Sequence, residues 1–120
     1  MEMNHTEFCK QVLEIDSQIR FSGILNSKGD LTVGVNRDDS AKLLNADEIK
    51  MSIHYTFQRW TSIQNLAHKI GTEKTNITEF EKVTLISILL DDGNLLLLSS
   101  EPGVNYMEII SKVKQSISEE

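Results

Sequence analysis

The spacing of hydrophobic and polar residues changes several times along the chain, and each change predicts the boundary of an element. Apolar residues recur on one helical face over residues 5–17, and Asn4 followed by Glu7 has the spacing of a helix-capping box. Alternation then predicts strands at 19–25 and 31–35, joined through the turn residues of the segment NSKGD. The first third of the chain is therefore expected to be a helix followed by a β-hairpin.

A polar connection, NRDDSAKLL, leads to the longest predicted helix. Asn45 and Glu48 again have capping-box spacing, and Gly71 provides the C-terminal cap. The helix has about 24 residues and a length of roughly 35 Å, which is the span of a whole small domain. Residues 72–80 are interpreted as a short strand at a sheet edge, although their weak pattern also allows an irregular segment.

The last third of the chain predicts two further strands and a helix. Residues 82–90 and 94–100 are the strands, and Asp92-Gly93 between them is typical of a type I′ turn, in which both residues have positive φ. The final helix is amphipathic, with apolar positions at Tyr106, Ile109, Ile110, Val113 and Ile117. The predicted order is helix, two strands, long helix, three strands, helix.

Both faces of the last predicted hairpin are apolar. Leu85 and Leu89 fall on one face of its first strand, and Ile86 and Ile88 fall on the other. A hairpin with one face in water would instead alternate between apolar and polar residues. The long middle helix is expected to cover one face of the sheet, and the first and last helices the other. We therefore predict an α+β fold, a three-layer α/β/α sandwich around a five-stranded antiparallel sheet.

The middle helix carries more apolar surface than a sheet can bury. At 100° per residue, its sheet-facing stripe comprises Ile49, Ile53, Phe57, Trp60, Ile63, Ala67 and Ile70. Met51, Tyr55 and Leu66 fall together on an adjoining flank, with Arg59 and Ser62 beside them. Burying one large apolar side chain stabilises a protein by roughly 1.5–3 kcal/mol, so three left together in water would be unfavourable.

Two interpretations of this flank compete. Its residues either pack under the loop at residues 36–44 or are simply exposed, as single apolar side chains often are. Alternatively, the flank meets the same helix of a second copy in a symmetric homodimer, in which each patch contacts itself. In that interpretation the dimer interface comprises Met51, Tyr55, Arg59, Ser62 and Leu66.

Composition and charge disfavour several kinds of partner. Apolar residues make up 39% and charged residues 25% of 120, which is typical of one soluble globular domain. The net charge of −6 argues against nucleic acid and anionic lipid as partners. The longest apolar run, residues 95–98, is far shorter than the roughly 20 residues that a membrane-spanning helix needs. A single cysteine, Cys9, allows no intramolecular disulfide and fits a reducing cytoplasm.

No group of residues has the spacing of a catalytic, cofactor-binding or metal site. His54 and His68 are about 21 Å apart on one helix and cannot share a metal ion. Cys9 has no second cysteine and no base placed beside it. The adjacent aspartates at 38–39 and at 91–92 point apart, and the second pair is explained by turn chemistry. We therefore expect that the protein is not an enzyme and uses no cofactor or metal.

The order of elements resembles that of the roadblock family of dynein light chains and their prokaryotic relatives, within the wider profilin-like and longin-like folds. The segment IRFSGILNSKGDLTVG is similar to the first hairpin of that family, and KVTLISILLDDGNLLLLSS is similar to its central hairpin. The chain is also similar to small archaeal proteins that carry a G-ILN--G start and an EKV before an apolar strand. The resemblance covers nearly the whole chain through structural motifs.

The resemblance implies a homodimer or heterodimer whose long helices pair antiparallel and whose third strands meet at the sheet edge. It also implies a scaffold role, because roadblock-like modules commonly bind small GTPases or motor components and have no catalytic residues of their own. Arg59 and Trp60 match no partner-binding motif, so a GTPase partner follows from the class alone.

Two functional hypotheses follow. The first is a cytoplasmic, non-enzymatic, dimeric interaction or scaffold module that regulates or assembles a partner protein such as a small GTPase. The alternative is a PAS-like small-ligand sensor. That alternative needs a cavity between the sheet and a helix, with an entrance through the loop at residues 36–44.

Overall fold

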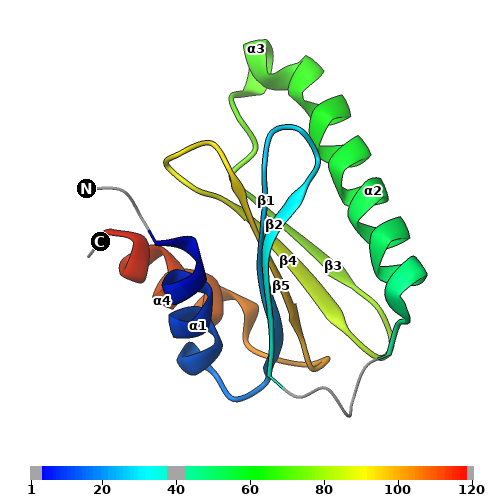
Figure 1. Ribbon diagram of the computed structural model, residues 1–120. Coiled ribbons are helices and arrows are strands. Elements are labelled where there is room, and N and C mark those ends of the chain that lie inside the picture. The colour runs from blue at the N-terminus through cyan, green and yellow to red at the C-terminus, as the bar shows by residue number, and fades with distance from the viewer. Residues whose placement is uncertain (1–3, 38–42, 119–120) are drawn as a thin grey trace.

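The computed structural model describes residues 4–37 and 43–118, which form one antiparallel sheet with helices on both faces (Figure 1). The elements, in chain order, are α1 (His5–Ile15), β1 (Ile19–Leu25), β2 (Leu31–Asn36), α2 (Ala46–Ile63), the 3₁₀ turn η2 (Gln64–Leu66), α3 (Ala67–Ile70), β3 (Thr75–Glu79), β4 (Thr84–Leu89), β5 (Leu95–Ser100) and α4 (Tyr106–Ser118). The weakly patterned segment after Gly71 is therefore a strand, β3.

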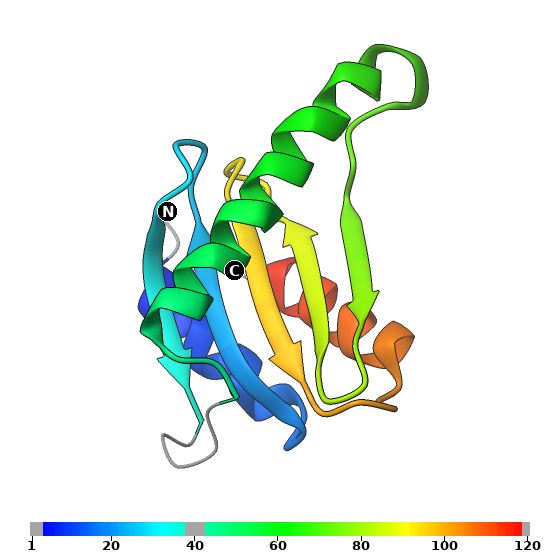
Figure 2. The same ribbon diagram turned by 90° about the vertical axis from the view of Figure 1, so that its right-hand side faces the viewer.

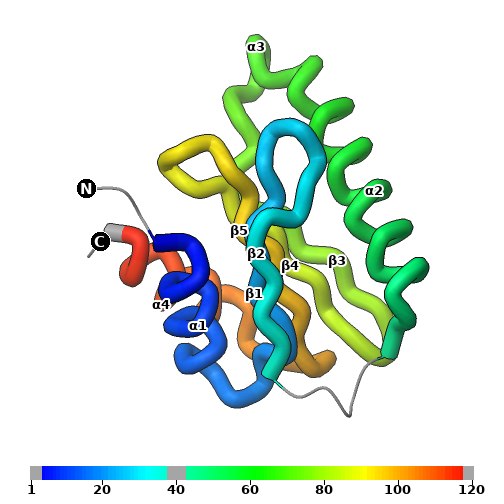
Figure 3. Tube along the Cα trace, viewed as in Figure 1, coloured from blue at the N-terminus to red at the C-terminus, as the bar shows by residue number. Residues whose placement is uncertain are grey.

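The sheet has the strand order β2-β1-β5-β4-β3, and every neighbouring pair is antiparallel. Strands β2 and β3 are its two edges. Helices α1 and α4 lie side by side on one face, and α2 lies on the other, as the tube in Figure 3 shows. The predicted three-layer α+β architecture is confirmed.

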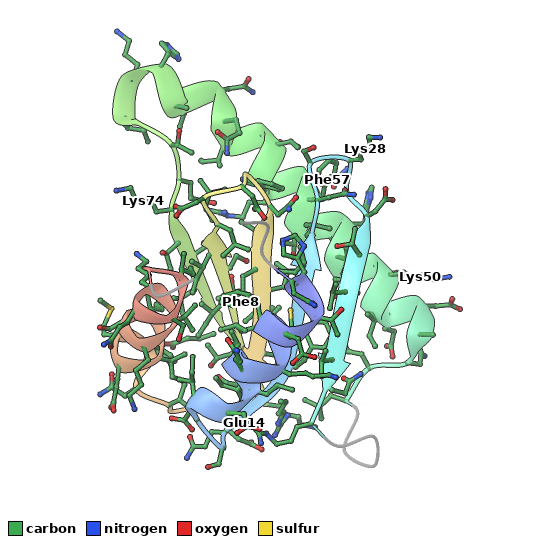
Figure 4. The ribbon with its side chains drawn as sticks, turned by 60° about the vertical axis from the view of Figure 1, so that its left-hand side comes forward. Phe8, Glu14, Lys28, Lys50, Phe57 and Lys74 are labelled. Atoms are coloured by element: carbon green, nitrogen blue, oxygen red, sulfur yellow. The ribbon has the colours of Figure 1, made fainter. Side chains whose placement is uncertain are left out.

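The main hydrophobic core lies between the sheet and the pair α1 and α4. Phe8 and Val12 of α1 meet Ile86 of β4 and Leu96 of β5 in this core, and Figure 4 shows Phe8 between α1 and the sheet. Residues 84–89 of β4 bury every second side chain on this face. The two-sided apolar pattern of the last hairpin therefore reflects helices on both faces, although the residues on the α2 side are only partly buried.

The second core, between the sheet and α2, is much smaller. Its buried residues are Leu25, Trp60 and Leu95, and the Phe57 ring packs edge-on against Trp60 with ring centroids 6.3 Å apart. Phe57 also covers the β1–β2 turn, where its ring lies within about 3 Å of the position that a Cβ on Gly29 would take (Figure 4). Few buried side chains therefore fix α2 to the sheet.

The C-terminal end of the middle helix projects past the sheet. Figure 2 shows α2 crossing the sheet obliquely and continuing, through η2 and α3, beyond the ends of the strands. Ile70, which the pattern placed on the sheet-facing stripe, is 75% exposed at this projecting tip. That assignment was wrong because the periodicity of a helix gives the face of each residue but not where the sheet beneath it ends.

The ends of the long helical segment are those expected from the sequence. Asn45 accepts a hydrogen bond from the Glu48 backbone N–H at 2.9 Å, and the Glu48 carboxylate accepts one from the Asn45 backbone N–H at 3.0 Å, which completes a capping box. Gly71 ends the segment with a φ of 86°. Between these caps the winding tightens at η2, so the expected single helix is three consecutive helical pieces.

The turn between β4 and β5 differs from the expected type I′ turn. Among the described residues only glycines have positive φ, so Asp92 does not adopt the required conformation, while Gly93 has a φ of 87°. The Gly93 N–H donates to the Leu90 carbonyl at 3.1 Å, and the Leu90 N–H donates to the Asn94 carbonyl at 2.9 Å. This pattern is that of a three-residue loop closed by a glycine bulge. The Asp92 carboxylate stabilises it by accepting from the Asn94 N–H at 2.9 Å.

Candidate interaction surface

The flank of α2 that carries the surplus apolar residues is exposed. Met51, Tyr55 and Leu66 are 55%, 61% and 48% exposed, so they are not buried under neighbouring elements of the chain. Tyr55, Arg59 and Ser62 line a shallow open hollow on this flank, together with Gln58 and Thr61. The loop residues 38–42, under which the flank could have packed, and the aspartate pair at 38–39 lie outside the described residues.

Exposed large hydrophobic side chains concentrate along this one helical segment. Six of the eight in the described residues belong to α2, to its lead-in or to its projecting end: Leu43, Leu44, Met51, Tyr55, Leu66 and Ile70. The other two are Phe80 and Met107. A cluster of this kind is typical of a protein interface, whereas single exposed apolar residues are ordinary.

Arg59 links the flank to the connection that leads into β3. Its guanidinium donates to both carboxylate oxygens of Glu73, at 2.9 and 2.7 Å. The hydrogen bond to Glu73 raises the pKa of the Arg59 guanidinium above its usual value. The exposed flank therefore faces the side of the molecule on which the edge strand β3 lies.

The sheet face beneath α2 is incompletely covered near this edge. In Figure 2, α2 crosses above the other strands and leaves the lower parts of β4 and β3 open on this side. Leu85 and Ser87 of β4 lie on this face, because they alternate with the buried Ile86, and both are only half-buried. Their β3 neighbours on the same face are Thr78 and Asn76. The candidate surface thus extends from the helix flank across the sheet to its edge.

Two titratable side chains outside this surface, those of His5 and Cys9, have structural surroundings. The His5 Nε2 lies 2.8 Å from the Asp92 Oδ2, which joins the start of α1 to the β4–β5 turn. Cys9 is fully buried, and burial raises the pKa of its thiol, so it is not a ready nucleophile. His54 packs beside Tyr55, and His68 is exposed at the projecting end.

The described residues contain no group of three or more His, Cys, Asp or Glu side chains that could hold a metal ion. A second hollow lies between β3 and α4, lined by residues that include Ile77, Met107 and Ile110. Neither this hollow nor the one on the α2 flank lies between α2 and the sheet, where a PAS-like ligand would bind. The PAS-like alternative stays a prediction.

No helix within residues 4–37 and 43–118 is long and apolar enough to cross a membrane.

Comparisons with known proteins identify the fold. No protein-family model matches the sequence, and no curated protein matches it. Among solved structures, Myxococcus xanthus MglB superposes with a TM-score of 0.75 and 14% identity, over 99% of this chain and 94% of that one. A Roadblock/LC7 domain from Streptomyces avermitilis superposes with a TM-score of 0.72 and 8% identity, over 95% of this chain and 92% of that one.

A third structure, described as MglB with a tetrameric arrangement, gives a TM-score of 0.75 and 13% identity, over 98% of this chain and 88% of that one. The chain therefore has a roadblock-like fold, as the sequence resemblance implied. At these identities the likeness concerns the fold alone. The resemblance to archaeal proteins stays a prediction.

The sequence reasoning missed several residues of the surface. Leu43 and Leu44 were assigned to a polar connection, although two leucines directly before a helix cap are a signal for an interface or staple. Glu73 gave no signal, because its pairing with Arg59 depends on the path of the chain between α3 and β3. Ile70 was assigned to the wrong surroundings, as described above.

Proposed function

We propose that this protein is a non-enzymatic interaction module of the roadblock type, which forms a homodimer through the flank of α2. The observation that carries the proposal is the exposure of Met51, Tyr55 and Leu66 together on one flank. Arg59 and Ser62 complete the proposed interface. Among the residues that the structure describes, no group of three or more His, Cys, Asp or Glu side chains could hold a metal ion at this surface.

The expected energy of covering the flank supports self-association. Fully burying a large apolar side chain stabilises by roughly 1.5–3 kcal/mol. The three side chains are about half exposed, so covering them would contribute roughly half of that amount each. A dimer covers two such flanks at once, because a two-fold interface uses the same patch on both copies.

The edge strand β3 extends the proposed interface. An edge strand presents unpaired backbone N–H and C=O groups, which readily pair with another chain. The pairing of Arg59 on the flank with Glu73, in the connection that leads into β3, supports this extension. A second copy seated on the flank would therefore also bring its own β3 close, which agrees with the meeting of third strands that the family resemblance implies.

The likeness to solved structures and the family resemblance of the sequence support a role in protein interaction. Proteins of similar fold include one described as MglB in a tetrameric arrangement, which is consistent with self-association in this fold. From the family resemblance we infer that the dimer regulates or assembles a partner protein, with a small GTPase as the partner class. The single cysteine, Cys9, is buried, and we place the protein in the cytoplasm.

Charge placed in the flank tests the proposal. Leu66→Glu and Tyr55→Glu should convert the dimer into a monomer, because each would put two carboxylates into an apolar interface. Light scattering coupled to size exclusion would then give 13.6 kDa instead of twice that mass. His54→Glu is the matched control, since it adds the same charge to a neighbouring exposed residue that points about 100° away from Tyr55. A wild-type protein with the mass of one chain would contradict the proposal. So would Leu66→Glu and Tyr55→Glu variants that remain dimeric.

A further inference from the structure

The edge strand β2 lies on the side of the sheet opposite to β3 (Figure 2). We propose that β2 pairs antiparallel with β2 of a second copy, with Gly34 of each copy at the centre of the shared ladder. This contact is separate from the dimer proposed above and does not depend on it. Together the two contacts would join dimers edge to edge into larger assemblies.

The backbone of β2 has unpaired groups along its outer edge. The Arg37 N–H donates to the Arg20 carbonyl at 2.8 Å, which fixes the phase of the β1–β2 ladder. Residues of an antiparallel pair alternate between bonded and non-bonded positions, so Val35 bonds to β1 as Arg37 does. Gly34 and Asn36 consequently direct their N–H and C=O groups away from the sheet.

This edge lacks the features that usually prevent strand pairing. Natural edge strands often carry charged residues or proline, or are covered by another element. The sequence of β2, LTVGVN, contains neither charge nor proline, and Thr32, Gly34 and Asn36 are exposed. Helix α2 begins above this edge in Figure 2, but it leaves these three residues exposed. The opposite edge strand, β3, carries Glu79, so β2 is the less protected edge.

The strand is complementary to itself when it is reversed about Gly34. A two-fold axis normal to the sheet sets the two Gly34 residues opposite each other, so that each N–H donates to the other's carbonyl. Thr32 of one copy is then opposite Asn36 of the other on the exposed face. On the α1 face, Val33 is opposite Val35, and both are only partly buried in the single chain. No like charges meet, so a second copy matches this edge along its length.

Gly34 is suited to the centre of this ladder. A Cβ built on it would lie 3.3 Å from Cε2 of Phe21 and 3.4 Å from Cδ2 of Leu31. The Phe21 ring thus packs over the glycine from the neighbouring strand and helps to hold the edge extended. A strand that is already extended loses little conformational freedom on pairing, which favours association.

The contact is expected to be weaker than that of the α2 flank. It consists mainly of backbone hydrogen bonds between strands with small side chains, so little apolar surface is covered. The flank instead offers three large side chains, Met51, Tyr55 and Leu66, that are about half exposed. Pairs should therefore form through the flank at micromolar concentration, and joining through β2 should require millimolar protein.

Disulfide trapping tests the register. Thr32→Cys and Asn36→Cys chains are oxidised at millimolar concentration, each alone and after mixing. The Cα atoms of a bonded antiparallel pair lie about 5.5 Å apart, which a disulfide can bridge. Like positions would lie about 13 Å apart along the ladder, which it cannot. Only the mixture should give a species of twice 13.6 kDa, and wild-type protein, whose Cys9 is buried, is the uncrosslinked control.

The outcomes separate this inference from the proposed function. The same mixture in a Leu66→Glu background should still crosslink, because the flank takes no part in the β2 contact. Crosslinking of either variant alone would overturn the register, and no crosslinking of the mixture would overturn the pairing of β2. Loss of the crosslink in the Leu66→Glu background would overturn the independence of the two contacts. The mass of the unmodified protein at micromolar concentration tests the proposed function separately.

Charge gives an independent test without crosslinking. A chain with Thr32→Lys and Asn36→Lys sets lysine against lysine at both contacts, whereas a chain with Thr32→Glu and Asn36→Lys sets opposite charges against each other. Both positions are exposed, so the fold should tolerate the substitutions. In sedimentation at millimolar concentration, the first chain should associate through β2 at least about tenfold more weakly than the second, a difference of about 1.4 kcal/mol. Equal association of the two chains would overturn the pairing of Thr32 with Asn36.

Discussion

Two hairpin turns depend on single residues whose conformation follows from the local sequence. Gly29 and Gly93 each have a φ near 87–88°, and each closes its turn by donating a backbone hydrogen bond at 3.1 Å. They differ in their surroundings, because Phe57 lies at 3.0 Å from a Cβ built on Gly29, while nothing lies within 4 Å of one built on Gly93. Gly29 therefore also serves the docking of α2.

Gly29→Ala should destabilise the fold by about 2 kcal/mol or more. Both Gly29→Ala and Gly93→Ala incur roughly 1–2 kcal/mol for a left-handed backbone, but only the first also displaces the Phe57 ring. The measurement is the free energy of unfolding from urea titration, with Gly93→Ala as the control. Equal losses in the two variants would show that Phe57 does not restrict this turn.

Asp92 makes a pH-dependent contribution at the other turn. Partial burial acts to raise its pKa, but hydrogen bonds from the Asn94 backbone and from His5 outweigh this and hold the pKa of Asp92 below its usual value of 3.8. A carboxyl group with a depressed pKa in the folded state stabilises the fold above its unfolded pKa. That stabilisation is lost as the pH falls through the folded pKa.

Below a pH of about 4, the wild type should therefore lose stability more steeply than Asp92→Asn, whose amide oxygen can still accept from the Asn94 N–H. The measurement is the unfolding midpoint of both proteins between pH 7 and pH 2.5. The difference in stability should be constant near neutrality and should shrink on acidification. Parallel curves over the whole range would contradict the role of Asp92.

At the scale of elements, the fold could be predicted from the spacing of apolar residues and from the residues that cap the helices. The alternation in β1 and β2, the apolar runs of β4 and β5 and the N-cap residues Asn4 and Asn45 are local signals, and the structure confirms the elements that they predicted. The position of Ile70 and the Arg59–Glu73 pair depend on where the sheet ends and how the chain returns, which no local pattern encodes. The residues of the proposed interface were predicted as apolar surface that the sheet cannot bury, and their role in a dimer stays a prediction.

The helix that carries the proposed interface, α2, begins with a complete capping box. Helix α2 is held to the sheet by a small buried cluster around Trp60, so its local stability matters more than that of α1. Asn45→Ala removes the side-chain acceptor of the capping box and should cost about 0.5–2 kcal/mol in the free energy of unfolding. Asn45→Asp, which keeps an acceptor, is the control, and urea titration is the measurement. An unchanged midpoint for Asn45→Ala would contradict the importance of this cap.

At the scale of the whole molecule, the two faces of the sheet have different roles. The side with α1 and α4 contains the main core and gives the fold its stability. The side with α2 has a small core, an exposed helix flank and an open edge strand, β3. In the proposed dimer, the second copy covers the side that the single chain leaves incomplete.

The central claim is that this exposed side is covered by a second copy of the same chain. Sedimentation equilibrium of the wild-type protein over micromolar concentrations tests it most directly. A mass of twice 13.6 kDa is the predicted result. A mass of 13.6 kDa at every concentration would contradict it.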